Sequence, residues 1–291
     1  MTAPSFIAKI KILNVIFLIQ LKRRFYATTN TRSARKVTKD FLLQQVTARK
    51  IKAAPQFQFS NQVIALFNLQ PPSSNLPLTV ALDYQQGLIM TPRTTRQLLN
   101  DFSHQSIFNF QQSRMLVRQT QHPHFLPLIL GRAAYLPLAG VSHGSTDWVG
   151  LHWQQDCWQN TPARQAEFIT LQNKILQFTY SSYRNLEDAV HLTSYYSEYL
   201  CRILQLIVQA SGARLESLPA AGLMHQFAQC SCRLHRQLPQ TNSEVRQFLQ
   251  SFQDWTLRQV AHFSELQLSA PLQEQTLKFW RSELAAVHCL W

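Results

Sequence analysis

The stretch Phe168–Val190, FITLQNKILQFTYSSYRNLEDAV, changes its hydrophobic period near the middle and so decides the fold class. Up to Tyr180, short apolar runs lie on either side of Gln172 and Asn173, which is the pattern of a β-hairpin. After Ser181 the apolar residues recur at nearly 3.6-residue spacing, which predicts one long helix from Tyr183 to Gln209. Because strands and helices occur in separate runs, we expect an α+β fold.

Upstream of this stretch the chain is expected to be rich in strands. Apolar runs of a few residues alternate with Pro, Ser, Asn or Gly, as in strands joined by turns. The helical pattern beginning at Thr94 or Thr95 is an exception, with Leu98, Leu99 and Phe102 on one face. The expected strands include QFQF (56–59), VIALFNL (63–69), LTVALDY (78–84), LIM (88–90), FLPLIL (125–130) and WVGLHW (148–153).

Downstream of the long helix the pattern is helical throughout. Breaks at Gly212, Pro219, Gly222 and Pro239 separate helices expected over 223–235, from Asn242 or Ser243 to 264, and over 272–290. We therefore divide the chain into a basic arm (1–54), a β-rich body with the long helix (55–209) and an all-α C-terminal extension (210–291).

The positive charge is concentrated at the N-terminus. Of the formal net charge of +13, residues 1–52 carry +11, with 12 basic residues against Asp40, which leaves +2 for the rest. Three interpretations of this arm stay open: an organellar transit peptide, residues upstream of the true start of translation, or a disordered basic arm that helps to hold nucleic acid. A secretory signal fits less well because Lys22, Arg23 and Arg24 follow its apolar core.

The remaining composition favours a cytoplasmic protein without a membrane anchor. The apolar run 10–21 is shorter than the roughly 20 residues needed to cross a bilayer, and Lys11, Asn14 and Gln20 interrupt it. Five cysteines without regular spacing do not suggest a disulfide framework, which agrees with a reducing compartment.

The segment GVSHG (140–144) matches the G-x-S-x-G pattern of serine hydrolases. In those enzymes a strand enters the serine and a helix leaves it. Here Pro137 precedes the motif and the strand-like WVGLHW follows it. We therefore interpret Ser142 as a turn residue and do not expect an enzyme.

Metal and phosphate motifs are also weak in the sequence. Cys230, Cys232, His225 and His235 could supply four zinc ligands, but two cysteines spaced C-x-C in a predicted helix would point to different faces. His122 and His124 flank a proline and are expected to lie in a turn. The chain has no Gly-rich phosphate-binding loop. We expect no metal and no cofactor.

Arginines form the strongest local signal for a binding partner. Five of them occur in forty residues that contain a single acid, Asp101. Such a patch suits phosphate contacts or insertion into a narrow minor groove of DNA, although scattered surface arginines would give the same pattern. The five are Arg93, Arg96, Arg114, Arg118 and Arg132.

A family resemblance joins these segments. The segments are, in order, VIALFNL, LTVALDYQQGLIM, RQLLNDFSHQSIFNF, Arg114 with Arg118, Pro137 eleven residues before Trp148, and FITLQNKILQFTYSSYRNLEDAV. This order resembles the ComK family of bacterial competence transcription factors. The resemblance covers roughly residues 55–205. The chain departs from the family at 108–113, where it reads FNFQQS instead of a Gly- and Ser-rich stretch, and at Thr146 and Asp147, where a cysteine usually precedes the tryptophan.

The resemblance implies a function. It implies a transcriptional activator of DNA-uptake genes that binds AT-rich double-stranded DNA as a homo-oligomer through phosphate and minor-groove contacts, with RNA polymerase and a Clp-protease adaptor as further partners. The five arginines would carry these contacts, with Lys174 and Arg184 as secondary candidates. The alternative is a regulatory protein-interaction module that acts through its helical tail, with apolar anchors at Phe248, Phe252, Trp255, Phe279 and Trp280.

Overall fold

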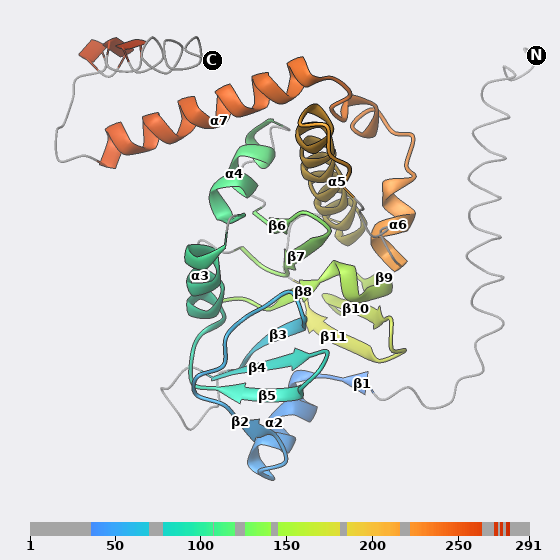
Figure 1. Cartoon of the computed structure of the whole chain (residues 1–291). Helices are drawn as coiled ribbons and strands as arrows, with labels where there is room; N and C mark the ends of the chain where they lie inside the picture. Colours follow the sequence, from blue (N-terminus) through green and yellow to red (C-terminus); the bar gives the residue numbers. More distant parts are fainter. Residues whose placement is uncertain are drawn as a thin grey trace, which may run out of the picture. The chain divides into compact units, whose positions relative to one another are not determined.

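The α+β class expected from the sequence is confirmed in the computed structural model. The structure describes residues 36–69, 78–106, 108–119, 126–140, 145–180, 185–215 and 222–263, together with a few helical residues between 271 and 279. These residues belong to one unit that begins at Lys36. Helices and two sheets make up its described part (Figure 1).

The larger sheet has seven strands and is antiparallel except at one edge, where β2 pairs in parallel with β5. Central strand β3 pairs with both β4 and β8, so Leu66 lies opposite Ala81 on one side and Trp148 on the other. The strands in spatial order are β2 (Lys52–Ala53), β5 (Gly87–Thr91), β4 (Leu78–Asp83), β3 (Val63–Leu69), β8 (Trp148–Gly150), β7 (Ala133–Pro137) and β6 (Leu128–Leu130).

The smaller sheet contains the hairpin predicted around Gln172 and Asn173. β10 (Gln165–Thr170) and β11 (Ile175–Thr179) pair antiparallel, and Asn173 adopts a left-handed conformation in the turn. Only one face of β10 is buried, through Ala166, Phe168 and Thr170, as in a sheet with one face toward solvent. The spatial order is β1 (Lys36–Val37), β11, β10 and β9 (Gln154–Asn160).

The larger sheet is covered on both faces, which explains why VIALFNL is an unbroken apolar run. Ile64 and Phe67 of β3 share one core with the smaller sheet, whereas Val63 and Leu66 pack into a second cluster with α3 (Thr95–Gln105). A strand with two buried faces has no need for polar residues in alternate positions.

The long helix is confirmed as α5 (Leu186–Ala210), and it organises the helical layer. Asn185 caps it by accepting a hydrogen bond from the Glu187 backbone N–H, and the acidic Glu187 and Asp188 lie in the first turn, where the helix dipole favours negative charge. Its buried face contacts β6 and β7 of the larger sheet and also α4, α6 and α7 (Figure 1).

The C-terminal extension differs from the prediction at its first helix. The helix expected over 223–235 ends early, as α6 (Gly222–Ala228), and a separate 3-10 turn, η3 (His235–Gln237), follows a loop. The next predicted helix is confirmed as α7 (Asn242–Phe263). Leu223, Phe248 and Trp255 are buried in the same core as the β-rich body, so the described extension packs on the body and shares its core.

The described unit begins at Lys36, before the boundary that was expected at residue 54 between the basic arm and the β-rich body. Residues 36–54 contain β1, α2 (Lys39–Thr47) and β2, and each strand adds to an edge of a sheet. Thr38 caps α2 through a hydrogen bond from the Phe41 backbone N–H, and Leu42 is fully buried. The basic residues Lys36 and Lys39 are therefore held in place, where they pair with Glu167 and Asp147.

Two smaller predictions were also wrong, and one helix was missed. QFQF is not a strand, although its Phe57 and Phe59 are buried. WVGLHW is a strand only through Gly150 and continues as a 3-10 turn. The helix α4 (Phe110–Gln119) was not predicted.

Candidate nucleic-acid interface

A cleft between α3 and α4 brings together two of the predicted arginines. Arg96 is exposed on α3 and Arg114 is exposed on α4, and both line a half-open cavity of about 230 Å³. Its other lining residues are Thr95, Leu99, Asn100, Ser103, His104, Phe110, Gln111, Leu126, Thr146 and Trp148. These residues give the cleft an apolar base and a rim of hydrogen-bonding groups.

Local hydrogen bonds fix the two helices that form the cleft. The Thr94 side chain accepts from the Gln97 backbone N–H at 3.0 Å and the Gln97 side chain accepts from the Thr94 N–H at 2.8 Å, a capping box that starts α3. The Thr95 hydroxyl donates to the carbonyl of Thr146 at 2.8 Å and ties this helix start to the segment that leads into β8. The backbone N–H of Phe110, at the start of α4, donates to the Ser103 hydroxyl at 3.3 Å.

The charge around the cleft is positive because the neighbouring acids are already paired. Among the described residues that line it, none carries a carboxylate. Asp101 of α3 forms an ion pair with Arg93, and Asp147 pairs with Lys39 at 2.8 Å. Burial raises the pKa of Asp147, an effect that the Lys39 charge opposes.

The other predicted contacts that the structure describes are not among the residues that line this cleft. The Arg132 guanidinium donates to Glu198 at 2.5 Å, and the Arg118 guanidinium lies over the Trp255 ring at 5.9 Å from its centroid. Lys174 is in the turn between β10 and β11 of the smaller sheet, and Arg184 lies outside the described residues. Of the six candidates that the structure describes, Arg96 and Arg114 alone line the cleft.

Sequence reasoning missed several polar residues of the cleft. Asn100, Ser103 and His104 follow Arg96 at helical spacing on α3, a signal that was present but was not used. Gln111 precedes Arg114 by three residues on α4, and because α4 itself was not predicted, this pair could not be recognised.

The GVSHG segment connects two antiparallel strands. Pro137 at the end of β7 lies opposite Trp148 of β8, so a strand follows the motif where a serine hydrolase would have a helix. Ser142 and His143 themselves lie outside the described residues. The expectation that a strand follows the motif is confirmed.

The possible metal ligands are arranged differently from what the sequence predicted. Cys230 and Cys232 lie in the loop after α6, not within a helix, so the argument that their side chains must diverge does not apply. Exposed His225 of α6 contacts Gln229, which follows the helix. His191 of α5 takes the fourth place in a cluster with both cysteines and His235. His122 and His124 lie outside the described residues.

The aromatic residues of the tail are largely used in packing. Phe248 and Trp255 of α7 are buried, and Phe252 packs against the same core. Phe279 is exposed, and Trp280 lies outside the described residues. Three of the five anchors proposed for a partner therefore contribute to the core instead.

Comparison of the chain with protein-family models, curated proteins and solved structures found no match. Among the described residues, none of the helices combines the length and the apolar character that crossing a bilayer requires.

Proposed function

We propose that this protein is a DNA-binding transcriptional regulator of the ComK kind that holds the phosphates of AT-rich duplex DNA at the cleft between α3 and α4. The observation that carries the proposal is the pair of exposed arginines, Arg96 and Arg114, that line this cleft from two helices. Neither forms an ion pair with an acid in the described part of the chain, so both charges are available to a ligand.

The neighbouring polar groups suit a phosphate backbone. Guanidinium groups bind phosphate oxygens in a bidentate manner, and the amides of Asn100 and Gln111 and the hydroxyl of Ser103 can donate further hydrogen bonds. Such contacts position a protein on DNA, and preference for AT-rich sequences would come from the narrow minor groove that attracts arginine. The resemblance to ComK supplies the biological role, activation of DNA-uptake genes by a homo-oligomer.

A titration of the full chain with duplex DNA tests this function. Fluorescence anisotropy with AT-rich and GC-rich duplexes of equal length, each at two salt concentrations, is expected to show binding that weakens with salt and favours the AT-rich duplex. Arg114→Ala should weaken binding and reduce the slope of log affinity against log salt by about one, as expected for one lost phosphate contact.

The matched control is Arg246→Ala, which removes one exposed positive charge from α7. It should leave the salt slope close to that of the unmodified protein. If the folded protein does not bind either duplex at micromolar concentration in low salt, or if Arg246→Ala and Arg114→Ala have equal effects, the cleft is not the DNA-binding site.

A further inference from the structure

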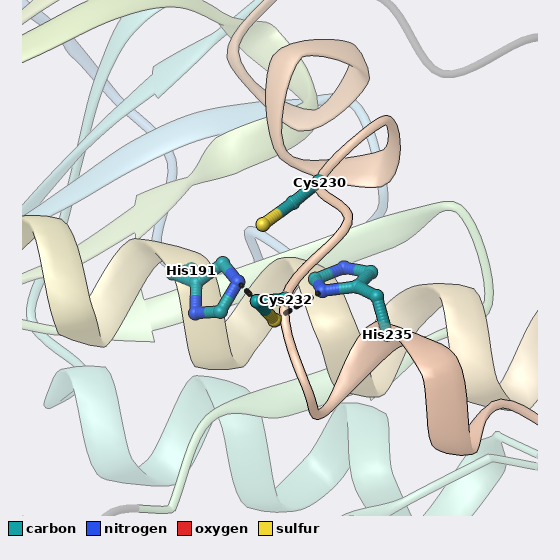
Figure 2. Close-up of side chains that lie close together, drawn as sticks. All are labelled: His191, Cys230, Cys232 and His235. Carbon is teal, nitrogen blue, oxygen red and sulfur yellow. Dashed lines mark hydrogen bonds between the residues drawn. The ribbon is translucent and has the colours of Figure 1, made fainter. Parts of the chain in front are cut away.

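Four side chains with metal-binding atoms converge where the loop after α6 meets α5. One atom each from His191, Cys230, Cys232 and His235 lies within 4.8 Å of all the others. The Cys232 sulfur is 3.5 Å from His191 Nε2 and 3.3 Å from His235 Nδ1 (Figure 2). The ligand set therefore joins residues 41 positions apart in the chain.

These separations fit a tetrahedral zinc ion. With Zn–S bonds of about 2.3 Å and Zn–N bonds of about 2.0–2.1 Å, neighbouring ligand atoms of a tetrahedron lie about 3.3–3.8 Å apart. Both distances from the Cys232 sulfur fall in this range. No separation in the cluster needs to shorten by more than about 1 Å, and the cysteines can make this adjustment because they lie in a loop between exposed neighbours.

The chemistry of the four residues selects zinc and a closed site. Two thiolates and two neutral imidazoles balance the charge of Zn²⁺, which matters because His235 is buried and the other three ligands are half-buried. Tetrahedral sulfur and nitrogen ligation is typical of zinc rather than of calcium or magnesium, which take oxygen ligands. Four protein ligands leave no position for a substrate, so the site is structural.

A bound metal ion accounts for the cluster better than ordinary core packing does. The two imidazole nitrogens that face Cys232 share a single sulfur, which carries one proton at most. A cation between these atoms would satisfy all of them at once.

The local backbone presents the ligands to α5. The Cys230 N–H donates to the Phe227 carbonyl at 3.0 Å as α6 ends, and the Arg236 N–H donates to the Cys232 carbonyl at 3.2 Å, which closes the turn between Cys232 and His235. The loop thus supplies three ligands in six residues, and α5 supplies the fourth.

We propose that His191, Cys230, Cys232 and His235 bind one Zn²⁺ ion in a structural site that fastens the loop between α6 and α7 to α5. Binding releases the two thiol protons to solvent and involves no change of oxidation state. The ion thereby links the C-terminal extension to the β-rich body, independently of whether the protein binds DNA.

Metal analysis of the full chain, purified with a thiol reductant from zinc-supplemented medium, tests the site. The expected content is about one zinc per chain. Replacement of the zinc by Co²⁺ should give the ligand-field bands of a tetrahedral ion together with thiolate-to-cobalt charge-transfer bands. A folded protein that holds no zinc and gives no tetrahedral cobalt spectrum would overturn the proposal, whatever the behaviour of the variants.

Matched variants separate ligation from packing. Cys232→Ser and His191→Ala should lose the metal, whereas His191→Cys should retain it because a Cys3His set also binds zinc. Cys157→Ser, at a half-buried thiol of β9, and His225→Ala, at the exposed histidine of α6, are the controls and should keep a full complement. Retention of zinc in both Cys232→Ser and His191→Ala would place the ion elsewhere and exclude this site.

Discussion

Phe67 of β3 and Phe178 of β11 stack face to face, with ring centroids 4.6 Å apart and ring planes 16° from parallel. Phe67 belongs to the larger sheet and Phe178 to the smaller one, and both side chains are almost fully buried. Because both rings are buried in the core that the two sheets share, the pair is expected to make a large contribution to the stability of the unit.

Truncation of this pair should therefore destabilise the protein strongly. Phe178→Ala is expected to lower the free energy of unfolding by about 3–5 kcal/mol, the range for a buried aromatic residue that leaves a cavity. Urea denaturation measures the change. Leu249→Ala, at a side chain of α7 that is 42% exposed, is the control and should change stability by less than about 1 kcal/mol. Equal effects of the two substitutions would show that the sheets are not joined through Phe178.

Stability should fall as the pH is lowered, in part because of His152. Its Nε2 lies 3.0 Å from the Asn61 carbonyl oxygen and its Nδ1 accepts from the Ala134 N–H at 3.3 Å, an arrangement of the neutral ring, and Tyr135 packs against it at 5.1 Å between ring centroids. Burial lowers the pKa of His152 below its usual 6.5.

The sign of this effect follows from proton binding. As the pH falls below about 6.5, the unfolded chain takes up a proton at His152 before the folded protein does, so the free energy of unfolding decreases down to the folded pKa. The melting temperature of His152→Gln, measured from neutral pH to about pH 5, should decrease less steeply than that of the unmodified protein. Parallel curves would mean that His152 does not contribute.

Arg132 should affect stability more than DNA binding. It pairs at 2.5 Å with Glu198, whose side chain is only 12% exposed, and Arg202 contacts the same carboxylate at 3.6 Å. Arg132→Ala leaves Glu198 with the weaker partner, and we expect a loss of about 1–2 kcal/mol, reduced from the value for fully buried pairs because Arg132 is partly exposed. A double-mutant cycle with Glu198→Gln measures the coupling. A large loss of DNA affinity without loss of stability would return Arg132 to the interface.

Arg93 should contribute less to DNA affinity than Arg96, although both lie at the start of the same helical segment. The ion pair with Asp101 compensates the charge of Arg93, whereas Arg96 faces the cleft. In anisotropy titrations, Arg96→Ala should weaken binding more than Arg93→Ala, and Asp101→Asn should strengthen binding because it removes a negative charge near the cleft. If the order of the two arginine variants is reversed, DNA approaches α3 from the side of Arg93.

Two glycines with left-handed backbone should respond differently to alanine. Gly212, after α5, has a φ of +78° and open space around its Cα, so Gly212→Ala should cost about 1–2 kcal/mol for backbone strain alone. Gly222, at the start of α6, has a φ of +55°, and a Cβ there would overlap the carbonyl oxygen of Gln154 in β9. Gly222→Ala should therefore destabilise the protein more than Gly212→Ala does, as measured by urea denaturation. Equal values would indicate that α6 can move away from β9 without a penalty.

Local patterns in the sequence were sufficient for the elements whose signals are contained in a few neighbouring residues. The 3.6-residue spacing predicted α5, and the possible cap at Thr94 or Thr95 predicted α3. The apolar run of β3 and the hairpin around Asn173 were likewise readable. The helix α4 was missed because its sequence, FQQSRMLVRQ, has few apolar residues and so gives a weak helical signal. Its apolar Met115 and Leu116 stabilise the helix only through their packing in the core of the body.

The amino-acid sequence by itself thus determined the α+β class, the long helix, and the arginine-rich segment as the region to inspect. Only the tertiary structure decided which side chains meet. It pairs Asp101 with Arg93 and brings Arg96 and Arg114 to the same cleft. It also places His191, and not His225, beside the two cysteines. The physical reason is that periodicity and capping act within one or two turns of chain, whereas a binding site depends on packing between segments that are far apart in the sequence.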